Sequence, residues 1–153
     1  MALPIVIDTS SLENVRAGLL QVKAILDTLE TDINANILTV ASGVYTPTLS
    51  NSTNVAASTP YQCQYLRVGS VVTVSGRVDI DPTATGNTIL YMSLPIASNI
   101  GTVEDIGGCF NGTTTQTSGG IYGDTAGDLA IFRYEAVSTA NIGLHFIFQY
   151  RII

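Results

Sequence analysis

The sequence is poor in the residues that catalytic and nucleic-acid sites require. Its six lysine and arginine residues are scattered, and twelve acidic residues bring the net charge to −6. Phosphate binding needs clustered positive charge, which excludes a nucleic-acid partner. His145 is the only histidine, which argues against histidine zinc sites and catalytic triads, and no glycine-rich phosphate loop joins a predicted strand to a predicted helix. We therefore expect no enzyme activity, no cofactor and no metal.

The chain also lacks an export or membrane signal. Residues 1–8 carry no basic side chain and reach a carboxylate after a few apolar residues, so they resemble neither a signal peptide nor a membrane span. We expect a soluble protein made in a cytoplasm, with no membrane insertion. Cys63 and Cys109 define no metal or redox motif. Without export we favour two buried thiols, and a disulfide between them is the alternative.

The composition changes once along the chain, near residue 43. Leu, Val, Ile, Ala, Glu and Asp dominate residues 10–41, whereas Gly, Ser, Thr, Asn and β-branched residues dominate the remainder. In the first segment, apolar residues recur at alternating spacings of three and four, which is the heptad pattern of a coiled coil. Gly43 is suited to end such a helix. The predicted seam, at heptad positions a and d, consists of Leu12, Val15, Leu19, Val22, Leu26, Leu29, Ile33, Asn36 and Val40.

We predict that residues 10–42 form a coiled-coil stalk of three identical chains. Leucine occupies most a positions, Ile25 widens the apolar stripe, and no Glu–Lys pairs specify a dimer. Asn36 is the polar member of the seam. It either controls the register or gathers with its copies around a water molecule or an anion. The alternative for this segment is an amphipathic helix packed on its own β-domain, although such a helix usually follows a 3.6-residue period.

Residues 43–153 show the short alternating runs of an all-β domain. Gly69-Ser70 suits a type II′ turn between two such runs, which predicts a β-hairpin. The pattern fits an antiparallel, jelly-roll-like β-sandwich of seven or eight strands. The clearest predicted strands are residues 61–68, 70–80, 88–94, 129–134 and 144–152. Loops are predicted at residues 81–87, 96–106 and 111–120, the last being either a flexible excursion or a contact loop for glycan or protein.

Two pairs of carboxylates are the remaining candidates for chemistry. Asp79 and Asp81 share one face of a strand end, and Asp124 and Asp128 flank a short glycine-containing turn. Either pair suits calcium binding or glycosidase chemistry, but the same residues are common in turns. We favour the turn interpretation, and we interpret His145 as a structural residue of an alternating strand.

Several short phrases follow the heptad segment in a fixed order. They are a Tyr-Thr-Pro-Thr opening at residues 45–48, an Arg-Val-Gly hairpin at residues 67–69, Leu94-Pro95, and an aromatic alternating strand at residues 146–152. In this order the chain resembles the small fibre and decoration proteins of tailed bacteriophages, over most of residues 43–153. The resemblance implies a homotrimeric virion protein of the phage head or tail, with no catalytic residues.

The expected function is therefore attachment at the surface of a phage particle. Residues 1–9 are expected to anchor the chain to capsid or tail proteins, residues 10–42 to form the trimeric stalk, and residues 43–153 to contact the host surface or its glycans. Two other functions stay open. One is a non-viral carbohydrate-binding module such as a bacterial surface lectin, and the other is a small glycan hydrolase.

Deletion of residues 144–153 is expected to unfold the β-domain. Each buried phenylalanine of this segment contributes roughly 1.5–3 kcal/mol by area, which is large against the marginal stability of a small domain. Urea denaturation followed by circular dichroism should show no cooperative transition in the truncated chain. A soluble truncated protein that unfolds cooperatively would contradict this prediction.

Overall fold

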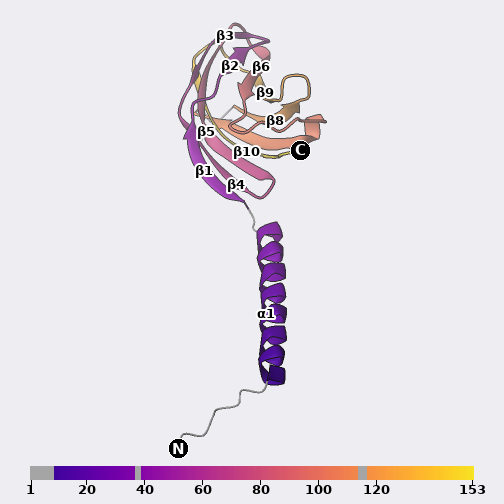
Figure 1. Cartoon of the computed structure of the whole chain (residues 1–153). Helices are drawn as coiled ribbons and strands as arrows, with labels where there is room; N and C mark the ends of the chain where they lie inside the picture. Colours follow the sequence, from indigo (N-terminus) through magenta and orange to yellow (C-terminus); the bar gives the residue numbers. More distant parts are fainter. Residues whose placement is uncertain (1–8, 37–38, 114–116) are drawn as a thin grey trace, which may run out of the picture. The chain divides into compact units, whose positions relative to one another are not determined.

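The computed structural model describes residues 9–36, 39–113 and 117–153, and of residues 33–36 only the backbone. The chain divides into two compact units, residues 1–38 and residues 39–153. The described part of the first unit is one helix, α1 (Thr9–Asn36), and the second unit is built from antiparallel strands (Figure 1). The prediction of a mainly β chain with an amino-terminal helix is thus confirmed.

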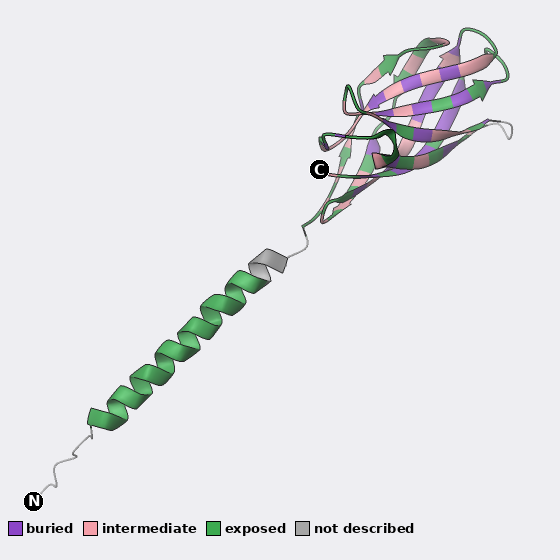
Figure 2. Cartoon of the chain, turned by 90° about the vertical axis from the view of Figure 1, so that its right-hand side faces the viewer, coloured by how far each residue is buried: buried purple, intermediate pink, exposed green. Residues whose placement is uncertain are grey.

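Helix α1 forms where the sequence favours a helix. Over its 28 residues it contains no proline and one glycine, Gly18, among many strong helix formers. Lys23 Nζ lies 2.7 Å from Asp27 Oδ2, one turn further along the helix, an exposed ion pair of small energetic value. All described side chains of the helix, residues 9–32, are exposed (Figure 2). The helix therefore obtains little stability from burial within its own chain.

Helix α1 ends at Asn36, before the predicted stalk boundary at residue 42. Strand β1 (Val40–Tyr45) follows and pairs antiparallel along its whole length with β4 (Cys63–Val68). Val40 is therefore a strand residue, so its prediction as a seam position is wrong. The prediction of Gly43 as the helix end is also wrong, because it lies within β1. The heptad spacing continues to Val40, beyond the end of the helix, but Val40 forms a strand because it pairs with β4.

The second unit is one antiparallel sheet with ten strands among the described residues, more than the seven or eight predicted. Its order is β1-β4-β5-β10-β7-β8-β9-β6-β2, with β3 paired to β5. A short 3-10 helix (Val103–Asp105) precedes β7. The strands besides β1 and β4 are β2 (Leu49–Asn51), β3 (Val55–Pro60), β5 (Val71–Pro82), β6 (Gly86–Ser93), β7 (Ile106–Gly112), β8 (Ser118–Asp124), β9 (Leu129–Ala136) and β10 (Ile142–Arg151).

The sheet curls because the consecutive strands β2 and β3 pair with strands far apart in it. β2 pairs with β6, whereas β3 pairs with β5, and four other strands separate β5 from β6 in the sheet order. Residues 49–60 therefore bridge the two sides of the sheet. The curl gives the sheet an enclosed inner face and a solvent-facing outer face, which Figure 2 shows as alternating buried and exposed residues along the strands.

The predicted hairpin and the predicted terminal strand are both confirmed. Val68 pairs with Val71 across a two-residue turn, in which Gly69 has a φ of 62°, as a type II′ turn requires at its first central position. β10 lies inside the sheet, paired with β5 on one side and β7 on the other. Its inner-face residues Leu144, Phe146, Phe148 and Tyr150 are buried.

Aromatic rings fill the inner face. Phe146 packs edge-to-face against Phe132 with ring centroids 5.1 Å apart, and Phe148 stacks at 5.8 Å on Phe146. Phe110 stacks on Phe132 at 5.5 Å, and Tyr150 lies 6.2 Å from Phe148. Because β7, β9 and β10 each contribute to this cluster, it holds separate parts of the chain together.

Glycines stand opposite these rings where the inner face has no room for a side chain. A Cβ on Gly119 would lie within 3 Å of the Phe110 ring, and a Cβ on Gly108 would overlap Phe148. Gly119 pairs with Phe110, and Gly108 with Phe148, across adjacent strands. The prediction of a loop over residues 111–120 is therefore wrong at both ends, which form parts of β7 and β8. The glycines there are spacers in a packed strand.

Hydrogen bonds tie the loop after β6 to the end of β10. The Tyr150 hydroxyl donates to the Ile96 carbonyl over 2.7 Å. The Ser98 hydroxyl donates to the Arg151 carbonyl, and the Ser98 amide donates to Asp128 Oδ2 over 2.8 Å. Burial raises the pKa of Tyr150 to about 12, so its hydroxyl remains a donor across the physiological range.

Replacing Gly119 with alanine is expected to destabilise the β-domain by about 1–3 kcal/mol, because the new methyl group overlaps the Phe110 ring and the Arg133 carbonyl. Gly107→Ala in β7 is the matched control, since a Cβ there meets nothing within 4 Å. It should change stability by no more than about 1 kcal/mol. Urea denaturation of both variants tests this, and equal effects would contradict it.

Candidate association surfaces

The apolar seam of α1 is exposed along its described length. Its side chains keep between 49% and 66% of their accessible surface. A row of exposed aliphatic side chains on one helix stripe is uncommon for a surface that stays in water. The described seam residues are Leu12, Val15, Leu19, Val22, Leu26 and Leu29.

Three of the predicted seam residues are not part of the exposed seam described above. The backbones of Ile33 and Asn36 belong to α1, but their side chains lie outside the described residues. Both hypotheses for Asn36, register control and convergence on an axis, therefore stay predictions. Val40 is in β1 and does not extend the seam. The predicted anchoring tip, residues 1–9, also lies outside the described residues except for Thr9.

A second exposed apolar surface lies at the start of the β-domain. Val40 pairs with Val68, and Val68 pairs with Val71, so the three valines form one row across β1, β4 and β5. They are 65%, 40% and 43% exposed, respectively. We call this set the valine row. The alternation of the β4–β5 hairpin places Val68 and Val71 outward, but only the pairing of β1 brings Val40 beside them.

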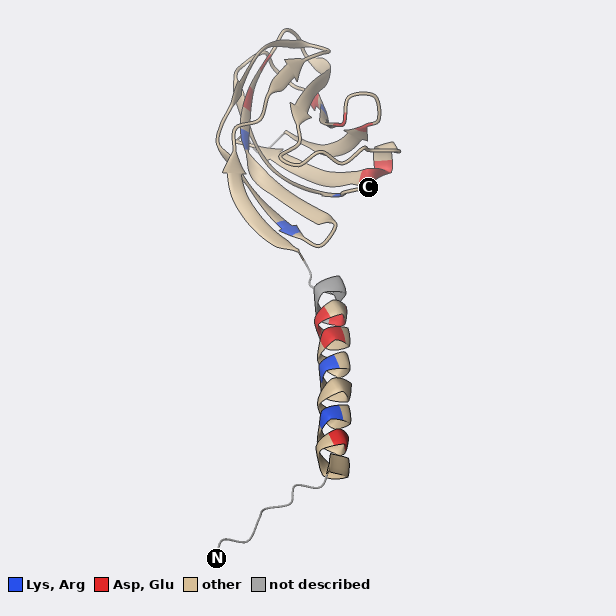
Figure 3. Ribbon diagram, in the orientation of Figure 1, with Lys and Arg blue, Asp and Glu red and all other residues tan. Residues whose placement is uncertain are grey.

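The outer face continues from the valine row with mostly uncharged side chains; Arg151, which pairs with Val71, is the charged residue beside the row. Leu66 and Ile147 are exposed there. Between them the polar neighbours are neutral, and Gln149 Nε2 donates to Thr73 Oγ1 over 3.0 Å. Figure 3 shows how sparse the charged residues are on the strands. Burying such a face costs less than burying ions, so it is suited to contact with another protein surface.

The carboxylate of Asp79 is held by two neighbours on the outer face. Arg77 Nε donates to Asp79 Oδ1 over 2.7 Å, and the Tyr61 hydroxyl donates to Asp79 Oδ2 over 3.0 Å. The Arg77 guanidinium also lies 5.0 Å from the Tyr61 ring centroid, in cation–π contact. Burial opposes ionisation of Asp79, but these hydrogen bonds outweigh it and lower the pKa of the carboxyl. This geometry is that of a structural ion pair.

Asp124 and Asp128 accept hydrogen bonds from backbone amides. Asp124 accepts hydrogen bonds from the amides of Ala126 and Gly127, and Asp128 accepts them from the amides of Ser98 and Ile100. Asp128 has a φ of 54°. In the described part of the chain, no three His, Cys, Asp or Glu residues come together as metal ligands do. The turn interpretation is confirmed for Asp124. Asp128 instead binds a distant loop at residues 98–100, and the turn interpretation is wrong for Asp81, which lies within β5.

The single histidine and the two cysteines belong to no such cluster among the described residues. His145 is exposed on β10, opposite Arg77 in the register. Cys63 and Cys109 are both free thiols, as predicted. Cys63 is buried, and burial raises its pKa, whereas Cys109 is exposed, so the prediction of two buried thiols is wrong for Cys109.

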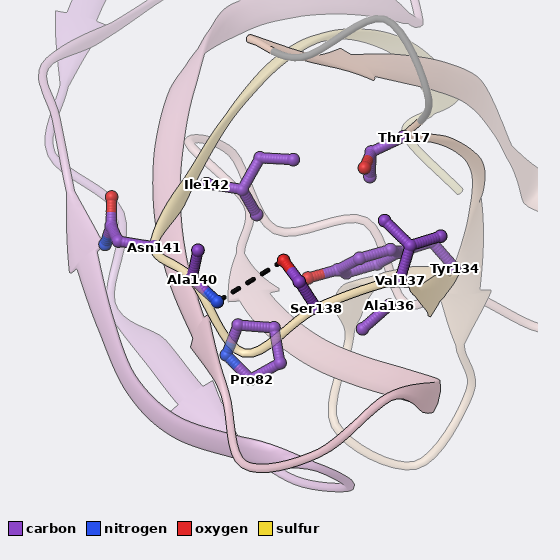
Figure 4. Close-up of a pocket in the computed structure, with 9 residues that line it drawn as sticks. All are labelled: Pro82, Thr117, Tyr134, Ala136, Val137, Ser138, Ala140, Asn141 and Ile142. Atoms are coloured by element: carbon purple, nitrogen blue, oxygen red, sulfur yellow. Dashed lines mark hydrogen bonds between the residues drawn. The ribbon is translucent and has the colours of Figure 1, made fainter.

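A small cavity lies beside the connection between β9 and β10 (Figure 4). Its volume is about 50 Å³, enough for one or two water molecules. Tyr134 lines it, and among the described residues its buried hydroxyl has no hydrogen-bond partner. Burial raises the pKa of Tyr134 to about 12. The cavity is too small for an organic ligand.

No family model, curated protein or solved structure matches the chain. Among the described residues, no helix combines the length and the apolar character that a membrane span requires.

Replacing Asp79 with asparagine is expected to lower stability at pH 7 by about 1 kcal/mol, because Arg77 loses its charged partner but remains partly in water. A lowered folded pKa stabilises the fold above the unfolded value of about 3.9, and that stability is lost as the pH falls through the folded pKa. The difference between wild type and variant should therefore shrink in acid.

Asp81→Asn is the matched control for this change, since Asp81 makes no ion pair among the described residues. It should alter stability at pH 7 by less than about 0.5 kcal/mol. Thermal denaturation between pH 2 and pH 7 measures both variants. A stability difference for Asp79→Asn that is unchanged at pH 2 would contradict the ion-pair assignment.

Proposed function

We propose that the chain is a non-catalytic structural subunit of a tailed bacteriophage particle, a homotrimeric fibre or decoration protein. Residues 1–9 anchor it to capsid or tail proteins, α1 forms a three-stranded coiled coil with two other copies, and the β-domain, folded in a jelly-roll-like manner, is displayed for attachment to the host surface or its glycans. This proposal keeps the expectation drawn from the sequence and shortens the stalk to α1.

The observation that carries the proposal is the exposed seam of α1. Each seam side chain, if buried, would contribute roughly 1.5–3 kcal/mol, and helix formation alone supplies little stability in water. Association with copies of the same helix buries the whole stripe at once. The 3.5-residue spacing of the seam is the spacing that such packing needs.

The composition of the seam supports three copies. Leucine at the a positions and Ile25 beside them broaden the apolar stripe beyond the narrow seam of a dimer. At 1.5 Å per residue, the 28 residues of α1 give a rod of roughly 42 Å. A rod of this length is a spacer between an anchoring point and the domain it displays.

The valine row supports contact between the β-domains of the same trimer. Only residues 37–39 join α1 to β1, and Asn36 and Val40 therefore lie within roughly 14 Å of each other. Three parallel helices, 8–10 Å apart at their axes, would bring three copies of Val40 into one neighbourhood. Val68 and Val71 lie beside Val40 in the sheet, so a small apolar contact forms there in the proposed trimer.

Light scattering after size exclusion is expected to give three times the 16.1 kDa mass of the chain. Leu19→Glu combined with Leu26→Glu should abolish the trimer, because six carboxylates would meet on the axis of the coiled coil. Gln21→Glu, which adds a charge outside the seam, is the control and should leave the mass unchanged.

A wild-type monomer at micromolar concentration would overturn the trimer. The β-domain of the Leu19→Glu, Leu26→Glu variant should keep its own cooperative unfolding, which separates loss of association from loss of folding.

Antibodies raised against residues 39–153 are expected to decorate the surface of intact phage particles in electron micrographs. Labelling should occur at regularly repeated positions, as for a protein bound to a symmetric shell or tail. Particles that contain the chain but never bind the antibody would contradict outward display of the β-domain.

A further inference from the structure

The outer face of β6, β8 and β9 contains a hollow that none of the surfaces above uses. Its volume is about 330 Å³, which lies in the range of small-ligand sites. It is open to solvent and belongs wholly to the β-domain. The residues that line it are Ile89, Tyr91, Val103, Tyr122, Ile131 and Arg133, and we call it the tyrosine groove.

Strand register sets the shape of the tyrosine groove. Tyr91 and Tyr122 both pair with Ile131, one from each side, so an aliphatic floor separates two aromatic walls. One step along the strands, Arg133 pairs with Ile89 and with Gly120. The guanidinium thus belongs to one end of the groove.

Tyr122 lies along the sheet surface and does not stand away from it. A Cβ on Gly120 would be 2.5 Å from the Tyr122 hydroxyl oxygen and 2.8 Å from Cζ, so the ring covers the place of the missing side chain. The side chain is still 45% exposed. A tyrosine ring held against a sheet with one face in water is a rigid apolar platform.

The groove also offers unused polar groups. Among the described residues, the hydroxyls of Tyr91 and Tyr122 make no hydrogen bond. Arg133 Nε donates to Asn87 Oδ1 over 2.9 Å, which positions the guanidinium. Arg133 forms no ion pair within the described ranges, although Glu135 lies two residues further along β9. Its charge is therefore available to an anionic ligand in a chain that is otherwise acidic.

We infer that the tyrosine groove binds a pyranose that carries a carboxylate, such as a uronic acid residue of a polysaccharide. The C–H face of the ring packs on Tyr122, the ring hydroxyls bond to the tyrosine hydroxyls, and the carboxylate pairs with Arg133. Arginine and carboxylate make strong charge-assisted hydrogen bonds, which is why an acidic sugar fits better than a neutral one. This inference names the glycan class for the attachment proposed above, and it rests on that function.

Saturation-transfer NMR on the full chain tests the inference with two probes, methyl β-D-glucuronide and methyl β-D-glucoside. The glucuronide should bind about tenfold more tightly, as expected for a charge-assisted contact. Arg133→Gln should remove this preference, and Tyr122→Ala should weaken both probes. Arg151→Gln, an exposed arginine on β10, is the control and should behave as wild type.

Four outcomes would overturn the inference. They are no transfer to either probe at 10 mM, equal affinity for both probes, a preference that survives Arg133→Gln, and a loss of oligomer mass in Tyr122→Ala, which would make the groove a contact between copies. The trimer is tested separately by mass, so a monomer that prefers the glucuronide would reject the fibre proposal and keep the sugar site.

Discussion

The packing of aromatic rings inside the curled sheet is the constraint on which the rest of the β-domain depends. Phe110, Phe132, Phe146 and Phe148 form one cluster from three strands. Because side chains alternate along a strand, the choice of inner residues also decides every outer residue. The outward direction of the valine row and of the tyrosine groove follows from this alternation, since a slip of one residue would bury both surfaces and expose the rings.

The same constraint explains why glycine is required at certain positions of the strands. The curl leaves little volume inside, so a large ring on one strand requires a glycine on the next, as Gly119 provides for Phe110. Protein interiors are close-packed, and neighbouring side chains must share the available volume. The β-domain therefore has its own sufficient core, whereas α1 has none among its described residues. The β-domain can fold on its own core, whereas α1 needs another surface against which to bury its apolar side chains.

Much of this could be predicted from local pattern. The β4–β5 hairpin and the inner face of β10 follow directly from period-two alternation, and the helix follows from apolar spacing and helix-forming residues. Strands β7 and β8 could not be predicted in this way. Glycines usually indicate a turn or a loop, and only the ring on the neighbouring strand explains why glycines occur within these strands. The strand position of Val40 could not be predicted for a different reason. Val40 satisfies the heptad spacing, and its pairing partner in β4 lies far along the sequence.

The tyrosine groove lies beyond prediction from sequence in the same way. Tyr91 and Tyr122 are distant in the chain, and no local motif joins them. They become neighbours only because both pair with Ile131 on β9. Sequence patterns indicate which face a residue occupies, but the register between strands decides which residues share a site.

The position of β1 has a mechanical consequence. Any load passing between the amino-terminal end of the chain and the β-domain enters near Val40, and β1 is an edge strand that pairs with β4 alone among the described strands. Tension is therefore borne first by the six-residue ladder between these two strands. Because β1 contributes no ring to the phenylalanine cluster, this ladder, and not the aromatic interior, is the first part of the β-domain that such a load meets.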